Sequence, residues 1–301
     1  MKTVLITGAT QGLGLAIARA LEADEDVQVV LAVRDLARGE AVARTLRGKP
    51  RVVALDLSSL EAIARFTESW REPLWALVNN AGVQVTGELT KTPDGFEETL
   101  AVNWLAPLRL TLGLLPWLKG GRVLNIGSGT HNPENRMATV FGFRGGRFSS
   151  IAELARGESD GATPKQRGMD RYATSKLIVT AGTAELARRY PATTFLTLDP
   201  GLMAGTGLAR TAPAIQKLAW STVLRWATPL LPDASTPTRS AGAARWLLTE
   251  GQLENGGVYA FDRRLSTRVW SGARVPELQR AVVDQALTLL APWAPRSGLV
   301  S

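Results

Sequence analysis

The sequence predicts an α/β protein built on a doubly wound parallel sheet. Strand-like runs alternate with helical patterns along the chain, and the first run leads through a glycine-rich turn into a helix. With 301 residues, 45% of them hydrophobic, the chain can bury one large core or at most two smaller ones. We therefore expect a single domain over residues 1–291.

Short runs of apolar, β-favouring residues recur, and most of them are separated by helical patterns. They cover residues 3–7, 27–33, 51–55, 74–78, 122–126, 193–198 and 258–261. Parallel strands need right-handed crossover connections, which place helices on both faces of the sheet. A ligand is then expected beyond the carboxyl ends of the strands.

The first turn carries three glycines. The strand-like run covers residues 3–7, the helical pattern covers residues 15–21, and Gly8, Gly12 and Gly14 lie between them. Such a turn lets backbone amides and a helix N-terminus approach a pyrophosphate without interference from a Cβ atom. The spacing is Gly-x3-Gly-x-Gly rather than the commoner Gly-x-Gly-x-x-Gly, and an ordinary glycine-rich turn is the alternative.

Tyr172 and Lys176 stand four residues apart. On a helix this spacing places both side chains on one face, where an ammonium beside a phenol favours the ionised form of the phenol. Tyr172 could then exchange protons near neutral pH. The alternative is a packed aromatic ring beside a solvated lysine.

Five motifs, in this order, make the chain resemble the short-chain dehydrogenase/reductase family over roughly its first 205 residues. They are Thr7-Gly8-Ala-Thr-Gln-Gly12-Leu-Gly14, Asn79-Asn80-Ala81-Gly82, Ser128, Tyr172-x3-Lys176 and Pro200-Gly201. The segment Asp94-Gly95-Phe96-Glu97 is among those that resemble the branch with retinol dehydrogenases and light-dependent protochlorophyllide reductases. The resemblance implies a Rossmann-type oxidoreductase.

The family's catalytic residues match four positions. Tyr172 would exchange the proton, Ser128 would stabilise the developing oxyanion, and Lys176 would bind the nicotinamide ribose and lower the pKa of the phenol. Asn103 matches the family asparagine that supports a proton-relay water, with a helix kink or cap as the alternative. His131 is either a contact for a polar group of the substrate or a loop residue without a role.

The resemblance also implies a set of cofactor-binding residues. They are Gly8, Thr10, Gln11, Gly12, Leu13, Gly14, Arg34, Arg38, Asp56, Leu57, Asn80, Ala81, Gly82, Tyr172, Lys176, Pro200, Gly201 and Met203. Asn79 and Asn80 can equally end a strand through side-chain hydrogen bonds.

The second predicted strand ends at a residue that indicates the cofactor. Relatives that use NAD carry an acidic residue there, whereas this chain has Arg34. A guanidinium can bind the 2′-phosphate of NADP, and Arg38 adds charge one turn later. Asp35 weakens this inference, and a surface salt bridge is the alternative. We expect NADP(H).

Three functions are compatible with these motifs. The first is hydride transfer between NADP(H) and a carbonyl or alcohol substrate. The second is reduction of a C=C bond in a large conjugated substrate, because the branch contains enzymes of both kinds. The third is an NADP-binding sensor without turnover, which the presence of all four catalytic residues disfavours.

Composition argues against several other classes. The chain has no cysteine and one histidine, so neither a disulfide nor a metal site is expected. Its formal charge of +8 is scattered without a basic run, which argues against nucleic acid. The sequence begins directly with a strand-like run, without a secretory signal, and we expect a cytoplasmic enzyme with a small-molecule, apolar substrate.

Three segments extend beyond the minimal pattern. Residues 131–171 form an insertion before the catalytic helix, expected to border the active site. Residues 204–237 are expected to form a helical cover over the substrate pocket, with a core helix or a shallow peripheral membrane contact as alternatives. Residues 292–301 are expected to form a flexible tail. Because the insertion can cover the helix through which relatives pair, we expect a monomer or weak homodimer.

Overall fold

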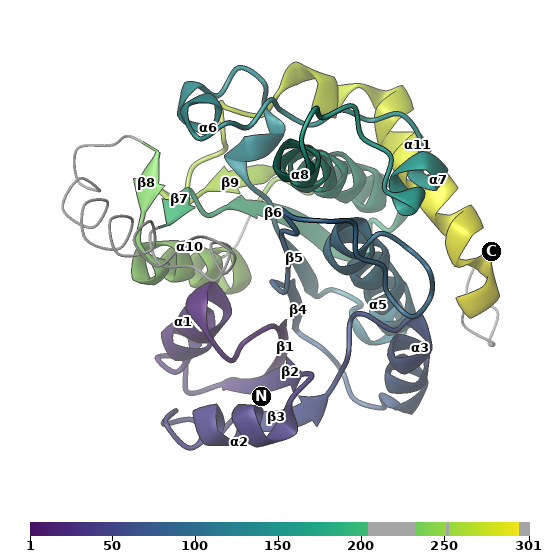
Figure 1. The fold of residues 1–301 in the computed structure, drawn as a ribbon. Coiled ribbons are helices and arrows are strands. Elements are labelled where there is room, and N and C mark those ends of the chain that lie inside the picture. The colour runs from purple at the N-terminus through teal and green to yellow at the C-terminus, as the bar shows by residue number, and fades with distance from the viewer. Residues whose placement is uncertain (204–232, 251–252, 295–301) are drawn as a thin grey trace.

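A parallel sheet of seven strands forms the centre of the molecule in the computed structural model, which describes residues 1–203, 233–250 and 253–294 (Figure 1). The strands are β1 (Lys2–Thr7), β2 (Val27–Val33), β3 (Arg51–Ala54), β4 (Ala76–Asn79), β5 (Arg122–Ile126), β6 (Thr194–Asp199) and β9 (Val258–Ala260). Their order in the sheet is β3-β2-β1-β4-β5-β6-β9, and each neighbouring pair is parallel. The predicted doubly wound α/β fold in one domain is confirmed, with a strand at each predicted run.

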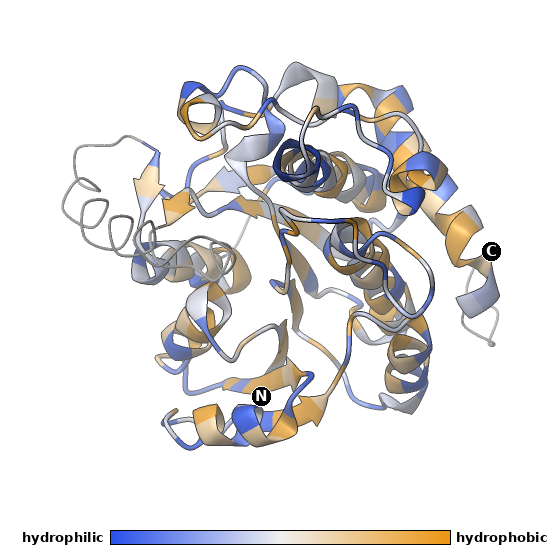
Figure 2. Ribbon diagram, viewed as in Figure 1, coloured by the Kyte–Doolittle hydropathy of each residue, from blue (hydrophilic) through white to orange (hydrophobic). Residues whose placement is uncertain are grey.

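Helices cover both faces of the sheet (Figure 1). One face carries α1 (Gly12–Leu21), α2 (Leu36–Ala43) and α10 (Pro237–Thr249), and the other carries α3 (Leu60–Ser69), α5 (Ala106–Leu114) and α8 (Pro164–Arg189). Another helix, α11 (Pro276–Leu290), packs against α8. Because helices lie on both faces, the central strands are apolar almost throughout, as Figure 2 shows.

Successive strand residues enter two separate core layers. In β1, Leu5 packs with α3, α5 and α8, whereas Val4 and Ile6 pack with α1 and α10. This is the alternation expected when successive side chains of a strand point to opposite faces. Helices therefore pack against the sheet on both faces, and this packing fixes the positions of the strand ends from which the loops begin.

Short elements complete the described chain. They are α4 (Glu98–Leu100), the π-helical turn η1 (Ala101–Leu105), α6 (Arg136–Val140), α7 (Ile151–Arg156), the strand pair β7 (Leu202–Met203) and β8 (Ala234–Ser235), and the 3-10 turns η2 (Leu115–Trp117), η3 (Gly129–His131), η6 (Ser271–Arg274) and η7 (Ala291–Trp293). The turn η1 connects α4 directly to α5.

The insertion is shorter than predicted. Helix α8 already begins at Pro164, because the Thr163 side chain accepts a hydrogen bond from the Gln166 backbone N–H at 3.1 Å and proline suits the first helical position. Residues 164–171 therefore belong to the helix that carries Tyr172. The insertion proper spans residues 131–163 and contains α6 and α7.

The flexible tail was predicted to begin too early. The backbone carbonyl of Trp293 accepts a hydrogen bond from the buried Arg109 side chain, so residues 292–293 are tied to the core. Residues 295–301 lie outside the described residues. Of the predicted substrate-side cover, residues 204–232 also lie outside them, and residues 233–237 contain β8 and the beginning of α10.

Candidate active site

The catalytic candidates gather at the carboxyl edge of the sheet. Ser128 follows β5, while Tyr172 and Lys176 lie one turn apart on α8 and are 5% and 6% exposed. The Lys176 Nζ atom lies 5.6 Å from the centroid of the Tyr172 ring and donates a hydrogen bond to the Ile126 carbonyl at 2.8 Å. The predicted shared face is confirmed, and the alternative of a solvated lysine is wrong.

Burial governs the protonation of this pair. It raises the pKa of Tyr172 to about 12, although a hydrogen bond with Ser128 acts in the opposite direction. It also lowers the pKa of Lys176 to about 8, while the negative charge of Asp199 opposes that change. The predicted lowering of the phenol's pKa by Lys176 stays a prediction, and in this structure the loss of hydration outweighs the favourable contact with Ser128. Tyr172 holds its proton at neutral pH.

Thr130 orients the hydroxyl of Ser128. The Ser128 Oγ atom accepts hydrogen bonds from the Thr130 backbone N–H at 3.3 Å and from the Thr130 hydroxyl at 3.0 Å. With both acceptor positions of Oγ used, the remaining capacity of the serine is to donate its own proton. Ser128 thus faces Tyr172 as a donor. The sequence reasoning did not identify Thr130, whose only signal was its place two residues after Ser128.

His131 braces the same loop. Its Nδ1 atom lies 2.6 Å from the Ser128 carbonyl oxygen, and its Nε2 atom accepts a hydrogen bond from the Trp270 backbone N–H at 3.4 Å. These partners assign the proton to Nδ1 of a neutral ring, and burial lowers the pKa of His131. Both ring nitrogens are used by the chain itself, so neither is left for the substrate contact considered from the sequence.

Asn103 fastens the segment after β4 to the catalytic helix. It lies in η1, where its Oδ1 accepts from the Val83 backbone N–H at 2.8 Å and its Nδ2 donates to the Val83 carbonyl at 3.0 Å. The same Nδ2 donates to the Ser175 hydroxyl at 3.0 Å. The alternative of a helix irregularity is confirmed. A Cβ atom on Gly82 would lie 3.2 Å from Asn103 Oδ1 and 3.8 Å from Lys176 Nζ, so these residues share one site.

The glycine turn leaves room and free amides at the start of α1. Gly12 has a φ of +56°, and no atom lies within 4 Å of the position that its Cβ would take. Helix α1 follows Gln11, and among the described residues no side chain caps its first turn. Uncapped first-turn amides and open space are what an anionic phosphate requires. Gly14 serves packing instead, since a Cβ there would lie 2.4 Å from Asn80 Nδ2.

Asn80 locks this turn against β4. Its Nδ2 donates to the Thr7 carbonyl at 2.9 Å and to the Gly8 carbonyl at 3.2 Å. In return, the Thr7 hydroxyl accepts from the backbone N–H groups of Asn80 and Ala81, both at 3.1 Å. Asn79 turns into the core and bonds to side chains of α5 and β5. The alternative of a strand-ending turn held by side-chain hydrogen bonds is confirmed for Asn80, whereas the Asn79 side chain bonds to the core instead.

The arginines expected at the adenosine end lie beyond β2. Arg34 is exposed, and no hydrogen bond or ion pair engages it within the described part of the chain. Arg38 Nη2 donates to Gln11 Oε1 at 2.6 Å, which joins α2 to the glycine turn. The carboxylate of Asp35 caps α2 by accepting from the Arg38 backbone N–H at 3.0 Å. Asp56 follows β3 and binds the backbone two residues further on.

The remaining predicted residues lie at the same edge. Thr10 is in the glycine turn, Leu13 is buried in α1, Leu57 packs on the core after β3, Pro200 and Gly201 follow β6, and Met203 ends β7. The structure thus brings the predicted cofactor residues to one edge, in the order of the strands that carry them.

Asp199 is a residue of this site that the sequence reasoning missed. It ends β6, and its Oδ1 accepts a hydrogen bond from the Gly201 backbone N–H at 3.1 Å. Its Oδ2 lies 3.3 Å from the position of a Cβ on Gly129, beside the loop of Ser128. The signal was its place at the end of a predicted strand, directly before Pro200.

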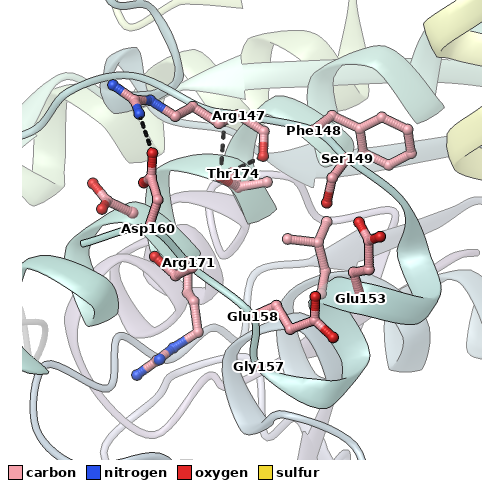
Figure 3. A pocket seen from close by; sticks show the side chains of 12 residues that line it. Arg147, Phe148, Ser149, Glu153, Gly157, Glu158, Asp160, Arg171 and Thr174 are labelled. Atoms are coloured by element: carbon pink, nitrogen blue, oxygen red, sulfur yellow. Dashed lines mark hydrogen bonds and ion pairs between the residues drawn. The ribbon is translucent and has the colours of Figure 1, made fainter. Parts of the chain in front are cut away.

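A cavity of about 700 Å³ lies on the opposite face of α8 (Figure 3). It is lined by the insertion and by Asp170, Arg171 and Thr174. Arg147 reaches Asp160 across its rim, and its backbone is bonded to the Thr174 hydroxyl. Tyr172 does not line this cavity, so it is distinct from the site described above.

Neither a metal cluster nor a membrane-spanning helix is found among the described residues. No group of three or more His, Cys, Asp or Glu side chains is placed there to hold a metal ion. None of the helices in the same part of the chain has the length and apolar character needed to cross a membrane.

Comparison with known proteins places this geometry in a family. The sequence profile described as short chain dehydrogenase matches residues 2–142. The chain is 32% identical over 286 residues to the protochlorophyllide reductase of Daucus carota, covering 85% of this chain and 69% of the relative. It is 32% identical over 300 residues to the polyprenol dehydrogenase of Mus musculus, covering 90% and 82%.

A solved structure agrees over almost the whole chain. An uncharacterised protein from Mycobacterium Paratuberculosis matches with a TM-score of 0.71 and 26% identity, covering 97% of this chain and 94% of that one. The parallel sheet, the glycine turn and the buried tyrosine–lysine helix stand in the same order along the chain as the motifs on which the resemblance was based. This chain belongs to the short-chain dehydrogenase/reductase family.

Proposed function

We propose that this protein is an NADPH-dependent reductase of carbonyl compounds and that Tyr172 is its proton donor. The observation that carries the proposal is the buried phenol of Tyr172, one turn from the buried Lys176, whose Nζ atom lies 5.6 Å from the centroid of the phenol ring. A phenol whose pKa is raised to about 12 carries its proton at neutral pH and gives it up only as negative charge develops on the acceptor oxygen. This favours reduction over oxidation, because alcohol oxidation would require the phenolate as a base.

The chain's own groups divide the work. NADPH, when bound, supplies the hydride that the carbonyl carbon accepts. Tyr172 Oη gives its proton to the carbonyl oxygen, and Ser128 donates a hydrogen bond to the same oxygen as negative charge develops there. The Lys176 ammonium, 5.6 Å from the centroid of the phenol ring, stabilises the phenolate that remains.

The glycine turn and α2 fit a phosphorylated dinucleotide. Gly12 and the uncapped start of α1 would hold the pyrophosphate, and Arg34 and Arg38 would hold the 2′-phosphate. The neighbouring carboxylate of Asp35 caps α2, and the positive N-terminal end of that helix offsets part of its charge. These features favour NADP(H) over NAD(H).

An aromatic neighbour of Tyr172 favours an apolar substrate. The ring of Phe143, on the insertion, is 6.1 Å from the Tyr172 ring between centroids, at an angle of 47°. Two relatives carry names that imply large apolar substrates, a protochlorophyllide and a polyprenol.

Reduction of a C=C bond in a large conjugated substrate is the second candidate function, favoured by the 32% identity to a protochlorophyllide reductase. A sensor without turnover is disfavoured because all four catalytic residues are present.

The burial of α8 bears on the oligomeric state. Nineteen residues of α8 are buried, and α11 of the same chain packs against both α8 and α7 of the insertion. A helix covered in this way cannot pair with a second copy without rearrangement, which favours a monomer or weak homodimer. The cytoplasmic location and the peripheral membrane contact stay predictions.

The test is consumption of NADPH in the presence of apolar ketones, aldehydes, quinones and enones, each compared with NADH. We expect turnover of at least one carbonyl compound, with NADPH preferred. Turnover confined to C=C bonds would select the second candidate, and cofactor binding without any turnover would select the sensor.

The cofactor preference has a matched pair of variants. Arg38→Ala removes a guanidinium beside the glycine turn, whereas Arg44→Ala removes an exposed arginine from the other end of α2. We expect Arg38→Ala to raise the KM for NADPH about tenfold and to leave that for NADH unchanged, since one charge-assisted hydrogen bond is lost. Arg44→Ala should change neither value. Equal effects of Arg38→Ala on both cofactors would contradict the assignment.

A further inference from the structure

The pairing of β5 with β6 places Asp199 near the strand residue that Lys176 contacts. Ile126 of β5 is the register partner of Leu198, the residue before Asp199. The carbonyl of Ile126 is also the acceptor for Lys176 Nζ, at 2.8 Å. Leu198 packs on the face of α1 and α10, so the next side chain, that of Asp199, points to the face of the sheet that carries α8 and Lys176.

The two oxygens of Asp199 have different surroundings. Oδ1 accepts from the Gly201 backbone N–H at 3.1 Å, which fixes the carboxylate in place. Oδ2 faces the turn of Ser128 and Gly129, 3.3 Å from the position of a Cβ on Gly129. No hydrogen bond to Oδ2 is formed by the residues that the structure describes. One oxygen thus anchors the group, and the other presents its charge to the site.

The titratable groups around Asp199 come from three parts of the chain. Helix α8 contributes Tyr172 and Lys176, and η3 contributes His131, whose buried ring is neutral. On the side of β8, Asp233 is already paired with Arg268. Within the described part of the chain this leaves the Lys176 ammonium as the cation that Asp199 can balance.

We propose that Asp199 is the counter-ion of Lys176 and, through it, a positioning residue of the catalytic pair. This inference rests on the proposed function, in which a cationic Lys176 stabilises the phenolate left by proton transfer. Burial works against the charged ammonium, and Asp199 is the charged group that opposes this effect. Removing the carboxylate should leave the lysine uncharged at a lower pH.

The direct test is an NMR titration of lysine side chains. The chain has seven lysines, so isotope-labelled lysine gives few signals, and Lys176→Met identifies the one of interest. The titration midpoint of Lys176 should fall by about one pH unit in Asp199→Asn, which keeps the oxygen that accepts from Gly201. Asp199→Glu, which keeps the charge, should restore most of the shift. An unchanged midpoint in a folded Asp199→Asn protein would overturn the proposal.

The pH profile of turnover gives a second readout. A lysine with a lowered pKa is needed in its protonated form, so activity should be present at lower pH and fall as pH rises through that pKa. In Asp199→Asn this alkaline limb should move down together with the NMR midpoint. Equal loss of activity at every pH, with the midpoint unmoved, would mean that the carboxylate contacts substrate instead and would overturn the proposal. Absence of carbonyl reduction in the unaltered protein would reject the proposed function, and the NMR result would still stand.

Discussion

The two faces of α8 hold their buried polar groups in opposite ways. Toward the strand ends, Lys176 is 6% exposed and makes no contact ion pair with any described residue, and Tyr172 is 5% exposed. On the far face, Asp170 is paired with Arg144, and Arg171 with Glu97 at 3.4 Å. The same helix therefore buries charge without a contact partner on one side and with one on the other.

The difference separates catalytic groups from structural ones. A buried ammonium without a contact partner lowers stability, and a chain retains such a group where its chemistry is used. Burial moves the pKa of Lys176 down and that of Tyr172 up, so the two groups titrate far from their ordinary values. Opposite charges neutralise each other on the far face, where the helix anchors the insertion.

The largest effect is expected from Tyr172→Phe. Loss of the proton donor should lower kcat about a thousandfold, while the ring that packs with Phe143 is retained. The matched control on the far face is Thr174→Val, which removes a hydroxyl bonded to the Arg147 backbone and should leave kcat unchanged. Initial rates of NADPH consumption and thermal melting measure both. Comparable loss of activity in the two variants would remove the distinction between the faces.

Asp170→Asn tests the structural face. The carboxylate is 5% exposed and accepts hydrogen bonds from Arg144 and Gln166, so removing its charge should lower the free energy of unfolding by about 2 kcal/mol. Asp160→Asn, in the same network but 65% exposed, should cost less than about 1 kcal/mol. Denaturant unfolding measures both. A fall in kcat of folded Asp170→Asn would show that the far face takes part in catalysis.

The smallest effect is expected from Thr130→Val. Without the threonine hydroxyl, the Ser128 hydroxyl group rotates more freely. We expect kcat to fall by roughly threefold to tenfold, which corresponds to the loss of one neutral hydrogen bond. Thr130→Ser keeps the donor and should retain the activity. Steady-state kinetics separate kcat from KM, and a change confined to KM would count against an orienting role.

The strands were predictable because their signal is local. Each of the seven runs is apolar over several residues, as strands buried on both faces must be. The glycine turn was predictable from the three glycines between the first strand-like run and the first helical pattern. The sequence signal for the beginning of α8 was equally local. Thr163 followed by Pro164 is a cap signal, which the surrounding glycine and charge obscured.

The protonation of Tyr172 and the place of Asp199 were not predictable in this way. The pKa of the phenol depends on how completely several distant segments exclude water, and the spacing of Tyr172 and Lys176 carries no information about that. Asp199 reaches the Ser128 loop only because β5 and β6 pair across the long insertion and α8. Spacing showed which groups share a face, and packing decided which of them is charged.

The account rests on the claim that burial keeps Tyr172 a proton donor, and an absorbance titration of the phenol tests it most directly. The chain has three tyrosines, so the difference between the unaltered protein and Tyr172→Phe isolates one of them. We predict no phenolate signal from Tyr172 between neutral pH and about pH 10, the ordinary value for a tyrosine. A Tyr172 phenolate that appears near neutral pH would contradict the account.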